Sequence, residues 1–193
     1  MKILFIMAAL AVAGALSGVQ KLQAQDLAVK SNLLYDATAT INLGVEAGLA
    51  EKWTIDISGN LNAWDFSGNR KWKHWLIQPE ARYWLCDKFN GHFFGLHVHG
   101  GAFNTANVKT PFGLFGDCSS ERHEGWYYGA GISYGYQWML GKRWNFELSI
   151  GAGYVRSDYD VYENPVCGDY LGKEHGNYFG ITKASASIIF LIF

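Results

Sequence analysis

The stretch GWYYGAGISYGYQWML, Gly125–Leu140, alternates its largest side chains with its smallest. Side chains of a β-strand point alternately to its two faces, so the stretch predicts a strand with one bulky apolar face. Its other face is nearly bare, with Gly129, Gly131 and Gly135 among its residues. What lies against each of these faces decides the fold.

The same alternation recurs through the chain and predicts eight strands. They are expected at 27–35, 41–49, 53–61, 74–85, 93–103, 126–140, 144–154 and 179–193. Short connections, at 50–52, 87–91 and 141–143, alternate with longer or more polar ones at 36–40, 65–71, 106–124 and 157–177. Short turns on one side and long loops on the other are typical of outer-membrane barrels. The sequence therefore predicts an all-β protein, an eight-stranded antiparallel up-and-down transmembrane β-barrel.

The N-terminus predicts a secretory signal peptide. Met1 and Lys2 precede an apolar run, Ile3–Val19, and a cleavage site fits after Ala24. The alternative is a membrane anchor, but the run is short for a spanning helix. We expect residues 1–24 to be the signal peptide and residues 25–193 to form one outer-membrane β-barrel domain.

The bulky face is expected to meet lipid. On 126–140 and 144–154 this belt comprises Trp126, Tyr128, Tyr134, Tyr136, Trp138, Trp144, Phe146 and Tyr154. Ten residues at a tilt of roughly 40° rise about 25 Å, the height of the apolar band of such barrels. A tight turn at Gly141–Lys142 would place Trp138 opposite Trp144.

The small face is expected to line a narrow lumen that is plugged by polar side chains. The predicted network comprises Lys30, Glu46, Asp56, Glu80, Arg82, His97, His99 and Glu147, with Lys183 as a further cation. Strand register puts Glu80 opposite His97 or His99. A metal site of these two histidines with His74 or Glu80 is an alternative, although structural packing is the favoured interpretation. We predict neither a cofactor nor a metal.

Two other kinds of protein compete with the membrane barrel. In a soluble β-sandwich or lipocalin-like barrel the bulky face would point inward, but the opposite face carries too few charges for a solvated surface. An enzyme at the outer rim, acting on lipopolysaccharide or phospholipid, would need a histidine, an acid and a nucleophile close together. The polar residues that could supply them are Ser119, Ser120, His123, Glu124, Asp158, Asp160, Glu163 and His175.

The composition bears on partners and on the cysteines. The formal net charge is −1 and no basic run indicates nucleic acid. Three cysteines in an exported chain permit one disulfide, and the expected pair is Cys118 with Cys167, which leaves Cys86 over.

Three blocks carry a resemblance to a known family. They are VKSNLLYDATATINLGVEAGLAEKWTIDISGN from Val29, KWKHWLIQPEARYWLCDKFNGHFFGLHVHGG from Lys71 and GWYYGAGISYGYQWMLGKRWNFELSIGAGY from Gly125. They resemble a Bacteroidota family of small outer-membrane barrels, catalogued as a domain of unknown function (DUF 3575). The resemblance implies an OmpA-like barrel in the bacterial outer membrane and supplies no catalytic residues. The expected partners are outer-membrane lipid and lipopolysaccharide, the barrel-assembly machinery, and a surface protein, in a structural, fimbrial or adhesin-associated role.

Overall fold

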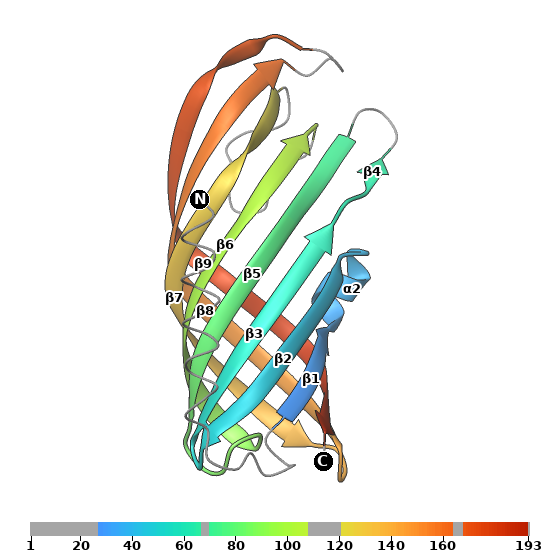
Figure 1. Ribbon diagram of the computed structural model, residues 1–193, viewed down its shortest axis with the longest axis vertical. Coiled ribbons are helices and arrows are strands. Elements are labelled where there is room, and N and C mark those ends of the chain that lie inside the picture. Colours follow the sequence, from blue (N-terminus) through green and yellow to red (C-terminus); the bar gives the residue numbers. More distant parts are fainter. Residues whose placement is uncertain (1–26, 67–69, 108–120, 164–167, 193) are drawn as a thin grey trace, which may run out of the picture.

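The chain forms eight antiparallel strands that close into a ring (Figure 1). The computed structural model describes residues 27–66, 70–107, 121–163 and 168–192. Apart from the two-residue strand at Asp65–Phe66, each strand pairs with the next along the chain, and the last returns to pair with the first. The elements are β1 (Leu27–Asn32), α2 (Leu33–Ala37), β2 (Ile41–Ala50), β3 (Trp53–Asn62), β4 (Asp65–Phe66), β5 (Arg70–Trp84), β6 (Gly91–Ala106), β7 (Glu121–Met139), β8 (Trp144–Glu163) and β9 (Tyr170–Ile192). The two-residue β4 continues β3 and pairs with the same strand, β5, so the nine labelled strands make up a barrel of eight strands. The predicted all-β, up-and-down fold is confirmed.

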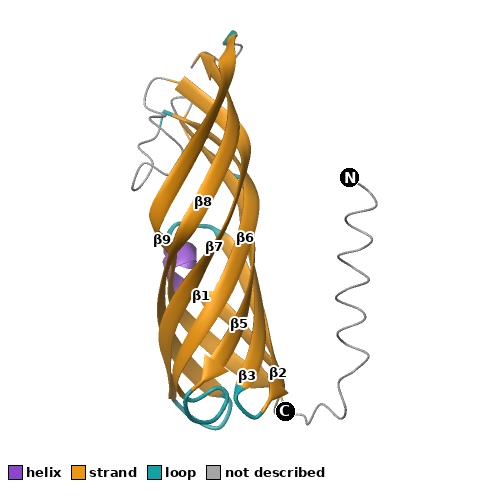
Figure 2. Ribbon diagram, turned by 90° about the vertical axis from the view of Figure 1, so that its left-hand side faces the viewer, coloured by secondary structure: helices purple, strands orange, loops and turns teal. Residues whose placement is uncertain are grey.

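The strands differ greatly in length, so the barrel has a closed lower half and an open upper half. β1 has 6 residues and β9 has 23, and β1 pairs with the residues 187–192 at the end of β9. Above β1 the longer strands continue as a twisted open sheet (Figure 2). In the described part of the chain, no helix is long and apolar enough to cross a membrane.

The structure corrects several details of the predicted strands. The first predicted strand, 27–35, ends at Asn32, because Leu33–Ala37 turns into the short helix α2, whose first turn is capped by the Asn32 side chain. β8 and β9 run through most of the segment 157–177 that was expected to be a loop. Between β7 and β8, Trp138 pairs with Phe146 and not with Trp144, because the turn takes four residues, Leu140–Arg143. This shift by two residues keeps every side chain on its predicted face, since faces repeat with a period of two.

A β-bulge in β9 determines which of its side chains face outward. Ile181 pairs with Ala152 and Lys183 pairs with Gly151, so Thr182 is the extra residue. Across a bulge the outward parity changes from odd to even residues. The bulge lets Lys183 point into the barrel although Phe179 and Ile181, of the same parity, point out of it.

Two asparagines join the helical turn α2 to the wall. The Asn32 side chain accepts a hydrogen bond from the Ala186 amide (3.1 Å) and donates one to the Ala184 carbonyl (3.2 Å). On the other side, the Asn42 side chain accepts a bond from the Asn32 amide (2.6 Å) and donates one to its carbonyl. These amide groups continue the backbone ladders for one step beyond the end of β1.

Candidate functional site

The interior of the barrel is layered, and its lowest layer is apolar. Ala28, Phe89 and Ile189 pack together at the short-turn end, with Leu191 against them. The Trp84 ring lies on Phe93 at 4.9 Å between centroids, and both side chains are fully buried. Together these six residues form an apolar layer, here called the floor, that closes the lower end of the lumen.

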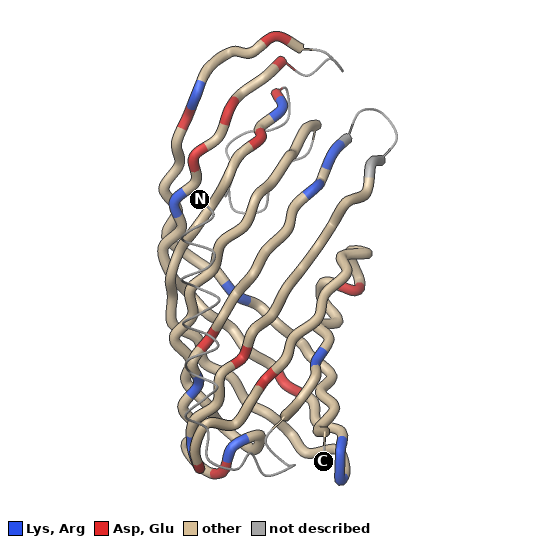
Figure 3. The backbone as a smooth tube through the Cα atoms, in the orientation of Figure 1, with Lys and Arg blue, Asp and Glu red and all other residues tan. Residues whose placement is uncertain are grey.

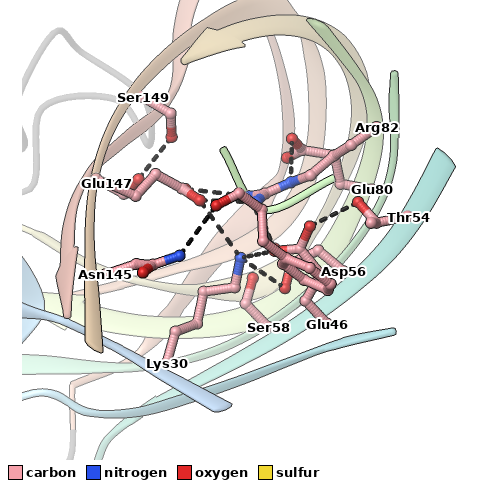
Figure 4. Close-up of polar contacts among 12 residues, drawn as sticks. Lys30, Glu46, Thr54, Asp56, Ser58, Glu80, Arg82, Asn145, Glu147 and Ser149 are labelled. Carbon is pink, nitrogen blue, oxygen red and sulfur yellow. Dashed lines mark hydrogen bonds and ion pairs between the residues drawn. The ribbon is translucent and has the colours of Figure 1, made fainter. Parts of the chain in front are cut away.

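A network of charges lies directly above the floor, and Arg82 is at its centre (Figure 4). Its Nη1 atom lies 2.8 Å from both Glu46 and Glu147, its Nη2 atom 3.2 Å from Asp56, and its Nε atom 3.0 Å from Glu80. One guanidinium therefore joins four carboxylates from four different strands, which uses the fixed fork of donors that lysine lacks.

Two lysines complete the network. The Lys30 ammonium lies 2.9 Å from Glu46, 3.1 Å from Asp56 and 3.9 Å from Glu147. Lys183 pairs with Glu80 from the other side. Four carboxylates against three cations leave a formal charge of −1 in the layer. Because buried charges are costly unless they are paired, this near balance is what makes the layer tolerable inside the barrel.

Hydroxyl groups tie the charge layer to the layers around it. The Thr54 hydroxyl donates to Glu46 (2.6 Å) and accepts from the Trp84 indole of the floor (2.9 Å). The Arg82 guanidinium also lies 4.4 Å from the centre of the Phe93 ring. The floor and the charges therefore form one connected unit.

The next layer explains the glycines of β7. The His97 and His99 rings lie 5.7 Å apart, and each faces a cross-strand glycine, Gly131 and Gly129 respectively. A Cβ atom at Gly131 would lie 2.8 Å from His97 Nε2, and one at Gly129 would lie 2.7 Å from His99 Nε2. The same Cβ atoms would lie even closer to the backbone carbonyl oxygens of Ala152 and Tyr154 on β8. The bare face of β7 therefore leaves the space, here called cradles, that the large rings of β6 and the close backbone of β8 require.

The predicted register of Glu80 is confirmed, but the predicted contact between Glu80 and a histidine is not found. His97 stands opposite Glu80 in the ladder, as one of the two predicted registers required. However, Glu80 accepts hydrogen bonds from Arg82, Ser133 and Lys183, whereas His97 Nε2 bonds the Thr182 hydroxyl at 2.9 Å. Over the described residues, no group of three or more His, Cys, Asp or Glu side chains is placed to hold a metal ion.

A second apolar layer covers the polar ones from above. It consists of Leu76, Phe103, Tyr127, Val155, Tyr159 and Val161, with Tyr178 packed against them. Between the two apolar layers, the charge network borders a cavity of about 40 Å³, next to Lys30, Arg82 and Lys183. A water needs roughly 10–15 Å³ of such space, so this cavity has room for a few waters.

The outer face of the barrel is apolar and aromatic. Trp126, Tyr128, Tyr134, Trp138, Trp144 and Tyr154 are exposed, and Tyr136 and Phe146 are half-buried. Ring pairs mark two levels of this face: Trp75 with Trp126 (5.8 Å) above, and Trp53 with Tyr83 (5.1 Å) and Trp138 with Phe146 (5.8 Å) below. All eight predicted belt residues therefore point away from the charged interior.

The residues considered for a rim enzyme divide between the two faces of the sheet. Glu124, Asp158, Asp160 and His175 line an outer groove of about 730 Å³, and no described residue that lines it is Ser, Thr or Cys. His123 is buried and stacks on Tyr159 at 4.8 Å between ring centroids. Ser119 and Ser120 lie outside the described residues.

The cysteines add little to the site. Cys86 is a free, exposed thiol at the short-turn end. The predicted partners Cys118 and Cys167 lie outside the described residues, as does the predicted signal peptide.

The sequence patterns identified the charge layer, although Thr54 and Ser133 were missed. Their hydroxyls lie on the small face of their strands, but nothing in the sequence says which carboxylate they bond. The inward position of Lys183 depends on the bulge at Thr182, which leaves no mark in a pattern with a period of two.

The fold and its interior define the class: a closed eight-stranded up-and-down β-barrel with a packed polar core and an apolar outer wall. The chain belongs to the family described as protein of unknown function (DUF3575), whose model matches residues 6–192. No curated protein matches the chain.

Proposed function

We propose that this chain is an integral outer-membrane β-barrel with a plugged lumen, which displays its outer end for a structural or surface-interaction role. The observation that supports it most directly is the inverted distribution of side chains. The buried residues include Arg82, Glu46, Glu80 and Glu147, whereas the exposed ones include Ile132, Leu96 and Trp126. A soluble barrel would place these two sets the other way round.

The positions of the charges support the same proposal. On the outer wall, the residues that face outward along β5 and at the position just after it, from Trp75 to Leu85, are Trp, Ile, Pro, Ala, Tyr and Leu. Charges on the backbone trace lie at the two ends, and those at mid-height are chiefly the interior network (Figure 3). An uncharged band with aromatic residues at its limits fits lipid and interfacial headgroups, including lipopolysaccharide.

In this proposal the exported chain is inserted by the barrel-assembly machinery, with its short turns toward the periplasm. The long strands β5–β9 then carry the partner-binding surface outside the cell. In this proposal the lumen does not transport solutes, since the ion pairs and the apolar floor beneath them fill the closed ring.

The test is cell fractionation together with gel migration of unboiled and boiled protein. We expect the protein in the outer-membrane fraction, with a folded form that migrates differently until it is heated. Release without detergent would overturn the proposal. In planar bilayers the purified protein should give no large, steady conductance.

The surface role needs a separate test. Deleting residues 108–120, which connect β6 to β7, should leave the heat-modifiable barrel and reduce binding to surface partners. Unchanged surface binding would mean that this connection takes no part in the interaction.

A further inference from the structure

The upper part of β9 has a strand neighbour on one side. β8 pairs with β9 from Tyr170 to Phe190, while β1 pairs with the other edge over residues 187–192. The Asn32 side chain also forms hydrogen bonds with the Ala186 amide and the Ala184 carbonyl on this edge. Among the described residues, no strand pairs with this edge of residues 170–186, which leads up to the end of the open sheet (Figure 1).

The alternation of the strand identifies the groups on the open edge. Ala184 and Ala186 direct their backbone groups to the side of β1, and the bulge at Thr182 changes the parity above it. The residues that present both N–H and C=O to the open side are therefore Lys173, His175, Asn177, Phe179 and Ile181. Their side chains point outward.

The exposure of one aromatic residue agrees with the missing neighbour. Phe179 is 81% exposed, although Tyr154, its ladder partner on β8, is 46% exposed at the same level. Tyr154 has a neighbouring strand on each side, β7 and β9, whereas Phe179 has a neighbouring strand on one side, β8. A strand laid along β9 would cover the Phe179 ring.

We propose that this edge of β9 binds an extended segment of another exported protein, which adds to the sheet as an antiparallel strand. Unpaired edges are templates for strand addition, in which backbone hydrogen bonds supply affinity and alternate side chains supply specificity. The inference rests on the proposed function, because it names how the outer end would hold its partner.

Two other occupants fit the edge less well. Lipid cannot satisfy backbone N–H and C=O groups, and open sheet edges do not occur against hydrocarbon. A second copy in the same membrane would present a β9 that runs in the same direction. Because barrel strands tilt by about 35–45°, the two edges would cross rather than align.

The side chains along the edge define the chemistry of the partner strand. An acidic residue fits opposite Lys173 and an apolar one opposite Phe179. β8 already provides this pattern on the other edge, with Asp160 opposite Lys173 and Tyr154 opposite Phe179. A synthetic peptide with the sequence of residues 153–162 is therefore a suitable probe.

The test uses the purified full chain in detergent and measures amide hydrogen exchange. Without peptide, the amides of Asn177 and Phe179 should exchange at least about tenfold faster than those of Gly176 and Tyr178, which face β8. Saturating peptide should slow the exchange of the first pair, and a peptide of reversed sequence should not. Equal protection of all four amides without peptide would show that the edge is already covered and would overturn the proposal.

Methylated peptides separate strand addition from other binding without changing the protein. N-methyl groups at peptide positions 156, 158 and 160, whose amides would face β9, should abolish protection. The same groups at positions 155, 157 and 159 should leave it. Equal effects of both peptides would contradict an added strand.

A matched pair of variants tests the edge from the protein side. N177P removes an amide from the open edge, whereas N177A retains it, and both lose the bond from the Tyr154 hydroxyl to the Asn177 side chain. N177P should weaken peptide binding at least about tenfold, and N177A should bind like the natural chain. These results do not depend on membrane location, so failure of the fractionation test and failure of this one are distinguishable.

Discussion

The lower and upper halves of this barrel are built on different principles. In the lower half every strand has two neighbours, and Arg82 connects four carboxylates beneath the histidine layer. In the upper half the sheet is open, and β9 has a free edge in the described structure. The difference predicts that the closed half provides most of the stability, whereas the open half is the part to which our proposal assigns partner binding.

The largest expected effect is the loss of the central cation. Arg82→Met leaves Glu46, Glu80 and Glu147 without their main partner and should lower the free energy of unfolding by about 3–5 kcal/mol. The measurement is urea unfolding of the purified barrel in detergent. Arg156→Met is the control, because Arg156 is exposed and lies 3.8 Å from Asp158. Equal losses in the two variants would contradict a central role for the charge layer.

A pair of core truncations compares the two halves directly. Ile189→Ala in the floor should cost about 2–5 kcal/mol, since it opens a cavity inside the closed ring. Val161→Ala removes a buried side chain far up β8 and should cost clearly less of the global stability, because the open sheet can loosen on its own. Similar losses would mean that both halves unfold as one unit.

Filling one of the cradles that the glycines leave on the small face should have a moderate effect on the free energy of unfolding. A Cβ atom at Gly95 would overlap the Glu80 carboxylate and the Ser133 hydroxyl. Gly95→Ala should therefore cost about 1–3 kcal/mol by overpacking, as measured by the midpoint of urea unfolding. Gly141→Ala is the control, since nothing lies within 4 Å of a Cβ atom there. A neutral Gly95→Ala would show that the layer is looser than its distances indicate.

The smallest expected effect on folding comes from shortening the upper hairpin. Joining β8 to β9 by a short turn in place of residues 159–174 removes strand outside the closed ring. The barrel should still fold, and its free energy of unfolding should fall least among these variants, because strand outside the closed ring opens locally at little cost to the whole. Heat-modifiable migration tests this, and a failure to fold would make the open half part of the stable unit.

The patterns of the sequence determined the strands and their faces. The period of two assigned the side chains from Trp126 to Trp138 to the correct face, because alternation is a local property of an extended chain. It failed at the end of the strand, where Met139 is exposed and Leu140 belongs to the turn. The same rule placed Lys30, Glu46, Asp56, Glu80, Arg82 and Glu147 in one interior, where the structure brings them together.

The tertiary structure decided what alternation cannot express. The shift of Trp138 to Phe146, the bulge at Thr182 and the strand lengths all depend on which residues of different strands oppose each other. That choice is made by cross-strand packing, such as the Gly131 cradle for His97, and by the space that four carboxylates need around one guanidinium. These contacts join residues far apart in the chain, so their geometry exists only once the ring has closed.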